Sequence, residues 1–403
     1  MSTGEDTAAL RTALVEHLRD DGLLRDERLA AAFARVPRHR FLPGEPVERA
    51  YADEAVVTRT ENGRPTSSAS QPAIVAIMLE QLDPRPGDRV LEIGAGTGYN
   101  AALLAELVGP AGAVTTIDLQ PDVAAEARAA LADAGYGSVR VLAGDGVLGD
   151  PAGAPYQRMI ATAACWELPA AWHDQLADGG VLVAPLRLNG MQASVALRRR
   201  GGELRARGGH PCGFMPVRGP AGGPVSWALA DGRTVVPDER LGDDDRDALS
   251  ALLAEPGIDV RDRFARISGL RIEKAAGALA WLAVHGLVVM GVAGVVQEGG
   301  PPVGIVIYDP PRGALVVAVD NASLQAGDVV AHGEWATIDT VVETLQAWDA
   351  AGRPGLGKLR LRAVRAARAA GMPAGAHDGT LCMRRGADVL ELRIAAPGPT
   401  RRR

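Results

Sequence analysis

The segment LEIGAGTGYNAALLAEL, residues 91–107, constrains the fold of this chain more than any other part of it. An apolar run over residues 89–93 leads into Gly94, Gly96 and Gly98, and an Ala- and Leu-rich stretch typical of a helix follows. A strand, a glycine turn and a helix N-terminus together form a binding site for a nucleotide-like ligand. The G-x-G-x-G spacing is shorter than the G-x-G-x-x-G of dinucleotide sites. It favours a ligand with one small anionic group, such as the carboxylate of S-adenosylmethionine (SAM), although a plain strand–helix connection is the alternative.

Apolar runs and helical patterns alternate on both sides of this turn. Strands are expected at 89–93, 113–118, 138–143, 156–162 and 179–185, and helices near 100–108, 121–134 and 168–176. Such alternation predicts a doubly wound, Rossmann-like α/β sheet with parallel strands, right-handed crossovers and helices on both faces. Ahead of the sheet, the sequence predicts an N-terminal cap of helices at Ala8–Leu18 and Asp26–Val36, a polar turn at Glu61–Thr66 and a helix from Ser70-Gln71-Pro72 to about Leu82.

Composition shifts near residues 201–223, where Gly, Pro and Arg dominate without clear periodicity. We expect a domain boundary there, which divides the chain into residues 1–220 and an α+β domain over 221–403. Helical patterns in the second part lie at 243–254, 272–285 and 338–350, and strand-like runs at 287–294, 303–308, 314–319, 358–362 and 388–393.

The bulk properties exclude several classes of protein. Only 4% of residues are aromatic and the net charge is −6, which argues against nucleic-acid binding. Three cysteines are too few and too scattered for a disulfide framework or a zinc site, and no metal site is expected, including at His210-Pro211-Cys212. Residues Met1–Ala8 lack an apolar signal-peptide core and no apolar run reaches about 18 residues. The sequence therefore predicts a cytoplasmic protein that is not bound to a membrane.

Acidic residues follow two of the predicted strands, at the edge where a doubly wound sheet binds its ligand. Asp118, at the end of the second strand, could accept hydrogen bonds from both ribose hydroxyls of SAM, and Asp145, after the third, from the adenine amino group. Both also have ordinary interpretations, as a helix N-cap and a turn residue. The complete predicted cofactor set is Glu92, Gly94, Ala95, Gly96, Gly98, Asp118, Leu119, Asp145, Gly146 and Thr162.

Three segments resemble the protein-L-isoaspartate O-methyltransferase family. SSASQPAIVAIMLEQL, residues 67–82, is similar to the family's serine-bearing loop and helix. LLRDERLAAAFARVPRHRFLP, residues 23–43, is similar to its N-terminal signature, and residues 144–169 resemble its adenine-side loop and fourth strand. The resemblance covers about residues 7–220 and implies a class I methyltransferase fold that uses SAM.

The resemblance also implies that Ser70 lies at the active site, although by itself Ser70 is most simply a helix N-cap. A carboxylate substrate is already ionised at neutral pH, so we expect Ser70 to orient it rather than to act as a base or nucleophile. Ser67, Ser68, Gln71 and Trp166 complete the predicted substrate-binding set. Trp166 and Trp172 could equally be ordinary packing residues.

The chain departs from the family's pattern in three places. Ser68-Ala69-Ser70 stands where the repair enzymes have Thr-Ile-Ser, Gln157 stands where Asp is usual, and some 180 residues follow the family's usual end. These features resemble the aspartate methyltransferases encoded with ribosomally made peptides. That likeness implies methylation of an ordinary aspartate in a precursor peptide, with the ester closing to a succinimide (aspartimide). Repair of L-isoaspartyl residues in proteins is the alternative.

Further interpretations stay open at this point. A small-molecule methyltransferase would share the glycine turn, and a non-catalytic SAM-binding module would bind the cofactor without turnover. Six basic and no acidic residues lie between Arg353 and Arg368. They could bind an acidic leader peptide or substrate, or simply form a solvated face. The sequence does not determine the oligomeric state.

Overall fold

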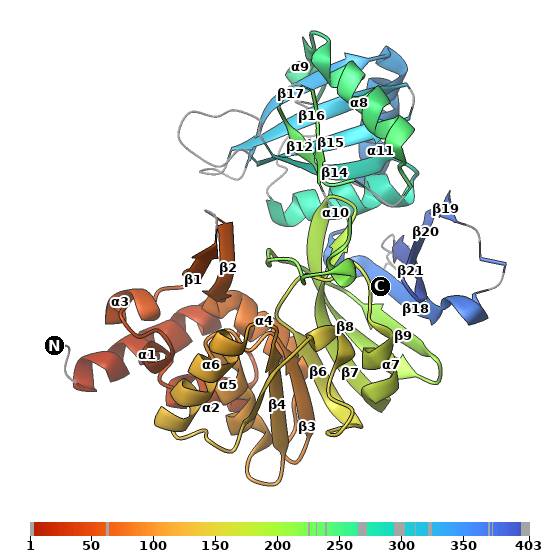
Figure 1. The fold of residues 1–403 in the computed structure, drawn as a ribbon. Coiled ribbons are helices and arrows are strands. Elements are labelled where there is room, and N and C mark those ends of the chain that lie inside the picture. Colours follow the sequence, from red (N-terminus) through yellow and green to blue (C-terminus); the bar gives the residue numbers. More distant parts are fainter. Residues whose placement is uncertain are drawn as a thin grey trace, which may run out of the picture. The chain divides into compact units, whose positions relative to one another are not determined.

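The computed structural model describes residues 4–61, 64–224, 226–230, 232–237, 240–264, 272–293, 303–310, 312–320, 325–369, 371–372 and 374–395. It divides into two compact units (Figure 1). The first comprises Met1–Pro185, Ser194–Leu204 and Cys212–Val217, and the second comprises Leu186–Ala193, Arg205–Pro211 and Arg218–Arg403. Because the units alternate along residues 186–217, the single boundary expected near residue 220 stays a prediction.

Five parallel strands form the centre of the first unit, in the spatial order β5-β4-β3-β6-β7. Their bounds are β3 Arg89–Ile93, β4 Ala113–Asp118, β5 Arg140–Ala143, β6 Tyr156–Ala161 and β7 Leu176–Leu188, and β8 (Met191–Arg200) follows β7 in the sheet. The connecting helices are α4 Pro72–Leu82, α5 Tyr99–Val108, α6 Pro121–Asp133 and α7 Ala170–Gln175. This order is doubly wound, with the switch point between β3 and β6. The predicted fold class is confirmed.

An N-terminal group of helices and a hairpin precede the sheet. The helices are α1 (Gly4–Asp20) and α2 (Glu27–Arg35), followed by the short α3 (Val47–Ala50). The antiparallel hairpin consists of β1 (Val56–Glu61) and β2 (Arg64–Ala69). The polar turn expected over Glu61–Thr66 is therefore wrong in extent, because Arg64–Ala69 is a strand. Its alternating small and polar residues lacked the apolar period that identifies a half-buried strand.

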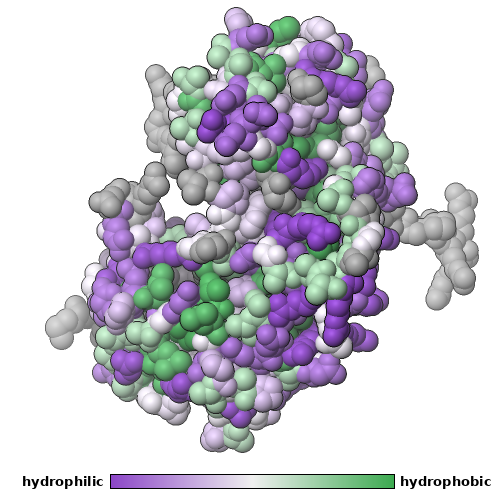
Figure 2. All heavy atoms as spheres, turned by 45° about the vertical axis from the view of Figure 1, so that its right-hand side comes forward, coloured by the Kyte–Doolittle hydropathy of each residue, from purple (hydrophilic) through white to green (hydrophobic). Residues whose placement is uncertain are grey.

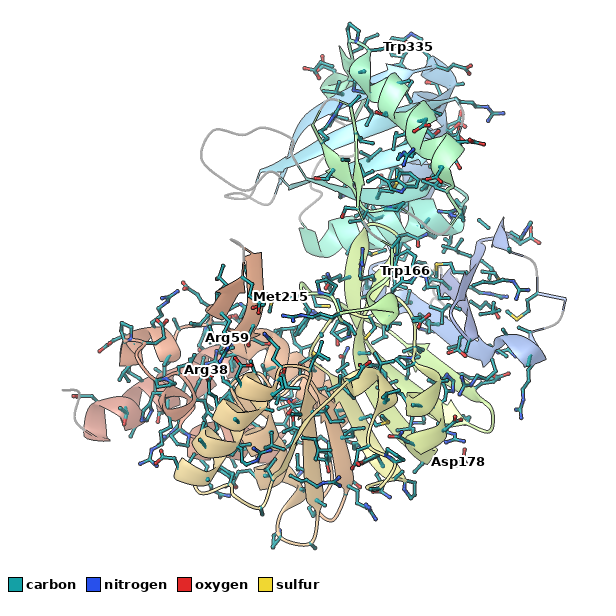
Figure 3. The ribbon with its side chains drawn as sticks, viewed as in Figure 1. Arg38, Arg59, Trp166, Asp178, Met215 and Trp335 are labelled. Carbon is teal, nitrogen blue, oxygen red and sulfur yellow. The ribbon has the colours of Figure 1, made fainter. Side chains whose placement is uncertain are left out.

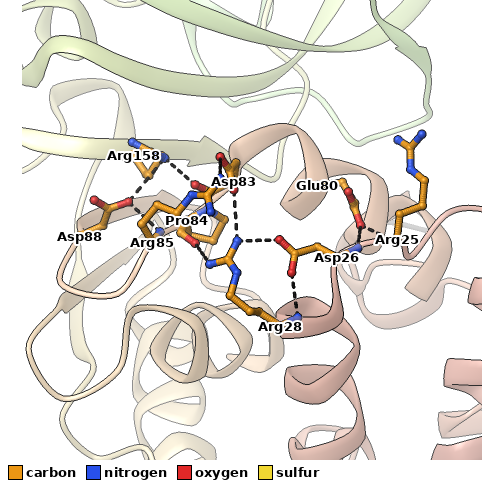
Figure 4. Close-up of polar contacts among 9 residues, drawn as sticks. All are labelled: Arg25, Asp26, Arg28, Glu80, Asp83, Pro84, Arg85, Asp88 and Arg158. Atoms are coloured by element: carbon orange, nitrogen blue, oxygen red, sulfur yellow. Dashed lines mark hydrogen bonds and ion pairs between the residues drawn. The ribbon is translucent and has the colours of Figure 1, made fainter.

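A polar network attaches the start of α2 to the helix–strand connection after α4 (Figure 4). Arg28 donates to the carbonyl of Pro84 at 2.8 Å and to Asp83 at 3.2 Å. The backbone N–H groups of Arg25 and Asp26 both donate to Glu80 Oε1, at 2.6 and 2.7 Å. Asp26 also caps α2 by accepting from the Arg28 N–H. The N-terminal helices are thus held to the sheet by directional contacts as well as by apolar packing.

The second unit contains a mostly antiparallel sheet in the order β11-β12-β14-β15-β16-β17-β13. Its strands are β11 Trp227–Ala228, β12 Thr234–Val235, β13 Ile258–Asp259, β14 Val288–Ala293, β15 Val303–Asp309, β16 Gly313–Asp320 and β17 Gln325–Gly333. The helices of this unit are α8 Asp243–Ala254, α9 Arg261–Phe264, α10 Ile272–Val284 and α11 Trp335–Ala350. The expected α+β character is confirmed, although β17 had not been predicted.

Further strands complete the second unit: β9 Glu203–Arg207, which begins in the first unit, β10 His210–Pro211, β18 Leu359–Arg365, β19 Gly375–His377, β20 Thr380–Arg385 and β21 Asp388–Ile394. Strands β18, β21 and β20 are antiparallel neighbours. Among the described residues, no helix is both long and apolar enough to span a membrane.

Candidate active site

The glycine turn connects β3 to α5 at the carboxyl edge of the parallel sheet. Gly94 has φ +99°, and a Cβ there would overlap the Thr162 hydroxyl, so the position requires glycine. The Thr162 Oγ1 lies 3.0 Å from the carbonyl oxygen of Ile93 and 2.8 Å from that of Gly94. Thr162 therefore holds the turn at the switch point between β3 and β6.

Helix α5 begins directly after the glycine turn. Gly98 is the N-cap residue, and no side chain caps it. The first N–H groups of a helix point along its axis and carry partial positive charge, so a carboxylate is stabilised there. The turn therefore fits the amino-acid part of SAM, as its spacing predicts.

Asp118 binds the glycine turn directly. One carboxylate oxygen accepts from the Gly96 N–H at 3.0 Å, and the other accepts from the Gln120 N–H at 3.1 Å. The N-cap of α6 is Gln120, so the interpretation of Asp118 as that N-cap is wrong. The next residue, Leu119, keeps 45% of its surface exposed. On the face drawn in Figure 2, hydrophobic side chains, coloured green, interrupt the hydrophilic surface. An exposed apolar side chain beside a carboxylate suits contact with a nucleoside.

The loop at residues 144–149, which follows β5, is held next to Asp118. The Gly144 N–H donates to the Asp118 carbonyl at 2.8 Å. Asp145 accepts from the Val147 N–H at 2.9 Å, which is the role expected of a turn residue. This hydrogen bond uses one carboxylate oxygen, so the other can accept from a ligand. Trp172 is fully buried and donates to the Gly146 carbonyl at 2.8 Å. Trp172 is thus a packing residue that supports this loop, and it does not line a substrate opening.

Ser67–Pro72 lies against the glycine turn. The backbone carbonyl of Ser68 lies 3.5 Å from the point where a Cβ on Gly96 would stand. Ser67 is buried, whereas Ser68 and Ser70 are half-buried. Segments that are far apart in sequence, the serine loop and the cofactor turn, therefore meet at one place.

Ser70 does not cap α4. The N-cap residue is Gln71, and the Ala73 N–H of the first turn donates to the Asp53 carboxylate at 2.8 Å. The second Asp53 oxygen accepts from the Gln71 side-chain amide at 2.9 Å. The N-cap interpretation of Ser70 is therefore wrong. Its hydroxyl makes no hydrogen bond to another of the described residues, which leaves it for a substrate.

Two arginines near this loop had no predicted role (Figure 3). Arg38 is buried and donates to the Ser70 carbonyl at 2.8 Å. Arg59, on β1, forms ion pairs with Asp122 and Glu126 on α6. Arg38 lies inside residues 23–43, which resemble the family's N-terminal signature. That resemblance was the only feature of the sequence that pointed to a role for Arg38. Nothing local pointed to Arg59, because its partners are more than sixty residues away.

Trp166 lies five residues after the end of β6, next to a segment that pairs with residues 215–217. Its neighbour Ala164 exchanges backbone hydrogen bonds with Met215 and Val217, at 2.8 and 2.9 Å. Trp166, which is labelled in Figure 3, is half-buried. Its predicted contact with substrate stays a prediction. Among the described residues, no group of His, Cys, Asp or Glu side chains is arranged to hold a metal ion.

A family model described as protein-L-isoaspartate(D-aspartate) O-methyltransferase (PCMT) matches residues 9–221. The chain belongs to this family. The protein-L-isoaspartate O-methyltransferase of Methanopyrus kandleri is 43% identical over 223 residues, covering 54% of this chain and 96% of that protein. The enzyme of the same name from Methanoregula boonei is 45% identical over 199 residues, covering 49% and 88%. A solved structure of that name covers 87% of this chain and 96% of its own, at 22% identity and a TM-score of 0.49.

Family membership confirms three expectations: the recognised family, the class of enzyme and the cofactor. The chain is a SAM-dependent carboxyl O-methyltransferase. The individual roles of the site residues, and the acceptor of the methyl group, are proposals that follow from the geometry above.

Proposed function

We propose that this enzyme methylates the carboxylate of L-isoaspartyl residues in proteins or peptides. The observation that carries the proposal is the contact between the serine loop and the glycine turn, at the Ser68 carbonyl and Gly96. It places the segment expected to hold the acceptor beside the segment expected to hold the donor. The family match over residues 9–221 supports isoaspartate over an ordinary aspartate, so it favours the alternative raised from the sequence.

The residues at the turn fit SAM. Gly94 cannot carry a side chain, the start of α5 is uncapped, and Asp118 stands at the end of β4. When bound, SAM supplies an electrophilic methyl group on a sulfonium. The first-turn N–H groups of α5 would hold its carboxylate, Asp118 its ribose, and the loop at Asp145 its adenine.

The acceptor needs orientation more than activation. A carboxylate with an ordinary pKa near 4 is ionised at neutral pH, so no general base is required. The Ser70 hydroxyl would donate a hydrogen bond to one carboxylate oxygen, which leaves the other directed at the methyl group. Positioning of this kind, together with exclusion of water, is the enzyme's contribution to the rate.

Labelled SAM and a pair of peptides that differ only in one Asp or isoaspartyl residue test the proposal. We expect base-labile label on the isoaspartyl peptide. Ser70→Ala should lose at least tenfold in kcat while it retains cofactor affinity, whereas Asp118→Ala should lose cofactor affinity itself. Label confined to the Asp peptide would overturn the isoaspartyl assignment, and cofactor binding without label on either would exclude both.

A second candidate is the aspartate of a precursor peptide, whose methyl ester would close to a succinimide. The observation that favours it is the second unit, since residues 222–403 lie beyond the family match. A part of the chain devoted to holding one particular peptide is consistent with such an acceptor, because a repair enzyme must accept many sequences.

One face of the β18-β21-β20 sheet supports this candidate. Arg360 and Arg362 lie on the same face of β18, and the register places them beside Arg393 and Glu391. Glu391 pairs with both Arg362, at 3.3 Å, and Arg393, at 2.8 Å, so one carboxylate faces several guanidinium groups. Same-face residues two apart on a strand lie about 7 Å apart, which matches alternate side chains of an extended acidic peptide.

Charge reversal distinguishes the two candidates. Arg360→Glu with Arg393→Glu should raise KM for an acidic precursor peptide at least tenfold and leave KM for a neutral isoaspartyl peptide unchanged. Arg263→Glu with Arg312→Glu, also in the second unit, is the matched control. If neither pair of substitutions changes KM for either peptide relative to the wild type, this face does not bind substrate.

A further inference from the structure

Arg38 is an unusual buried charge. Only 1% of its surface is exposed, and no carboxylate among the described residues lies within ion-pair distance. One terminal nitrogen, Nη1, is buried without a hydrogen-bond partner. Burial lowers the pKa of the guanidinium, as expected when water is removed from a cation. Because an unpaired buried cation destabilises a fold, core stability alone does not account for an arginine here.

The contacts of Arg38 join three segments of the chain, two of which belong to the candidate site. Its Nε donates to the carbonyl of Ala50 at 2.9 Å, and Nη2 donates to the carbonyl of Ser70 at 2.8 Å. Its guanidinium carbon lies 4.8 Å from the centre of the Tyr99 ring, within the range of a cation–π contact. Tyr99 is the first residue of α5 and directly follows Gly98.

The backbone around Ser70 needs such contacts. Ser70 follows β2 and precedes α4, so neither a strand ladder nor a helical hydrogen bond fixes its conformation. Asp53 restrains the downstream side through Gln71 and Ala73. Arg38 restrains the carbonyl of Ser70 itself. Together they leave the Ser70 hydroxyl as the group not committed to the protein.

We propose that Arg38 is a positioning residue that sets the Ser70 hydroxyl relative to the cofactor turn. The same guanidinium contacts the loop expected to hold the acceptor, through Ser70, and the helix expected to hold the donor, through Tyr99. A displacement of about 1 Å between reacting groups can lower a rate by a hundredfold. Arg38 therefore acts on the rate through Ser70 and has no contact with the reacting atoms. This inference rests on the proposed methylation at Ser70.

Arg38→Lys is the informative variant, because lysine keeps the charge but cannot donate to two carbonyls in a fixed fork. We expect kcat to fall at least tenfold, with the Kd for S-adenosylhomocysteine unchanged within twofold in calorimetry. Arg28→Lys is the matched control: Arg28 lies on α2, ten residues before Arg38, and donates to a carbonyl just past the other end of α4, that of Pro84. It should change thermal stability and leave kcat within twofold of the wild type.

The decisive comparison places Arg38→Lys in a Ser70→Ala background. If Arg38 acts through Ser70, the second substitution should lower kcat less than twofold further. An equal loss in both backgrounds would overturn the proposal, as would wild-type kcat in Arg38→Lys or a parallel loss of S-adenosylhomocysteine affinity.

Variants that do not fold, and a wild type without turnover, also give a definite answer. If Arg38→Lys does not fold, Arg38→Gln replaces it, and a failure of both to fold would assign Arg38 to core stability and overturn the proposal. If the wild type itself shows no turnover on either peptide, the proposed function falls together with this inference. Turnover in the wild type combined with additive losses overturns the positioning role alone.

Discussion

Glu92 is a fully buried carboxylate one position before the end of β3. Asn100, in the first turn of α5, donates to one of its oxygens at 2.7 Å, while the other oxygen is buried without a hydrogen-bond partner. Burial, with a smaller contribution from the nearby Asp118 charge, raises the pKa of Glu92 to about 7 against the opposing effects of Thr116 and Asn100. A proton on Glu92 is therefore bound more tightly in the folded protein than in the unfolded chain.

This pKa predicts how stability changes with pH. An acid whose pKa is raised on folding contributes stability below its unfolded value, near 4.5, and loses it as the pH rises through about 7. The shift corresponds to about 3 kcal/mol. In Glu92→Gln, which cannot ionise, the decline in unfolding free energy between about pH 5 and pH 8 should be smaller by about that amount, as measured by urea denaturation.

The control for this experiment is Glu16→Gln, at an exposed carboxylate on α1. It should keep the pH dependence of the wild type. The same decline in Glu92→Gln as in the wild type would show that Glu92 is not protonated in the folded protein near neutral pH.

Residue-level prediction succeeded where backbone conformation dictates the residue. Gly94 needs a positive φ and a bare Cα, a requirement that is local and visible in the sequence. Only the alternative interpretation of Ser70 as an N-cap was wrong, because a carboxylate from Asp53, seventeen residues upstream, accepts the first-turn N–H instead. A cap supplied by tertiary contact leaves no local signal.

At the scale of elements, the β1–β2 hairpin is tied to the cofactor side of the sheet. Arg59 on β1 pairs with Asp122 and with Glu126, the latter at 2.6 Å, and Gln120 donates to Glu61 at 2.9 Å. These partners lie at the start of α6, directly after Asp118. The hairpin otherwise forms a two-stranded sheet of its own, which packs less than a central strand does.

We expect Arg59→Gln to loosen the hairpin without unfolding the protein. Exposed ion pairs contribute little to global stability, but here they are among the few contacts that hold this element. Amide hydrogen exchange in residues 56–69 should accelerate several-fold, while exchange in β3 and β4 stays unchanged. The matched control is Arg49→Gln, which removes an exposed pair with Glu45 inside the N-terminal region. Equal exchange in both variants would contradict a tethering role for Arg59.

At the scale of the whole molecule, the chain forms two units, and the predicted cofactor residues all belong to the first. A ligand that binds only folded protein stabilises it by RT ln(1 + [L]/Kd), or about 2.7 kcal/mol at a hundredfold excess over Kd. Scanning calorimetry should therefore show S-adenosylhomocysteine raising the unfolding temperature of the first unit more than that of the second. If S-adenosylhomocysteine raises the unfolding temperature of both units by the same amount, the two units unfold in one cooperative transition.

The sequence by itself determined the parallel sheet, the glycine turn and the cofactor, because each depends on local periodicity or on a short motif with one backbone solution. The family followed from the resemblance of three segments. Only the tertiary structure decided that Asp53 caps α4, that Arg38 holds the Ser70 carbonyl and that Arg59 anchors the hairpin. It also revealed strands that the sequence analysis had not predicted, among them β2, β8, β17 and β20. The physical reason is the same in each case. Hydrogen bonds and ion pairs between distant segments form only when the fold brings their side chains together, and no local sequence pattern predicts which side chains will meet.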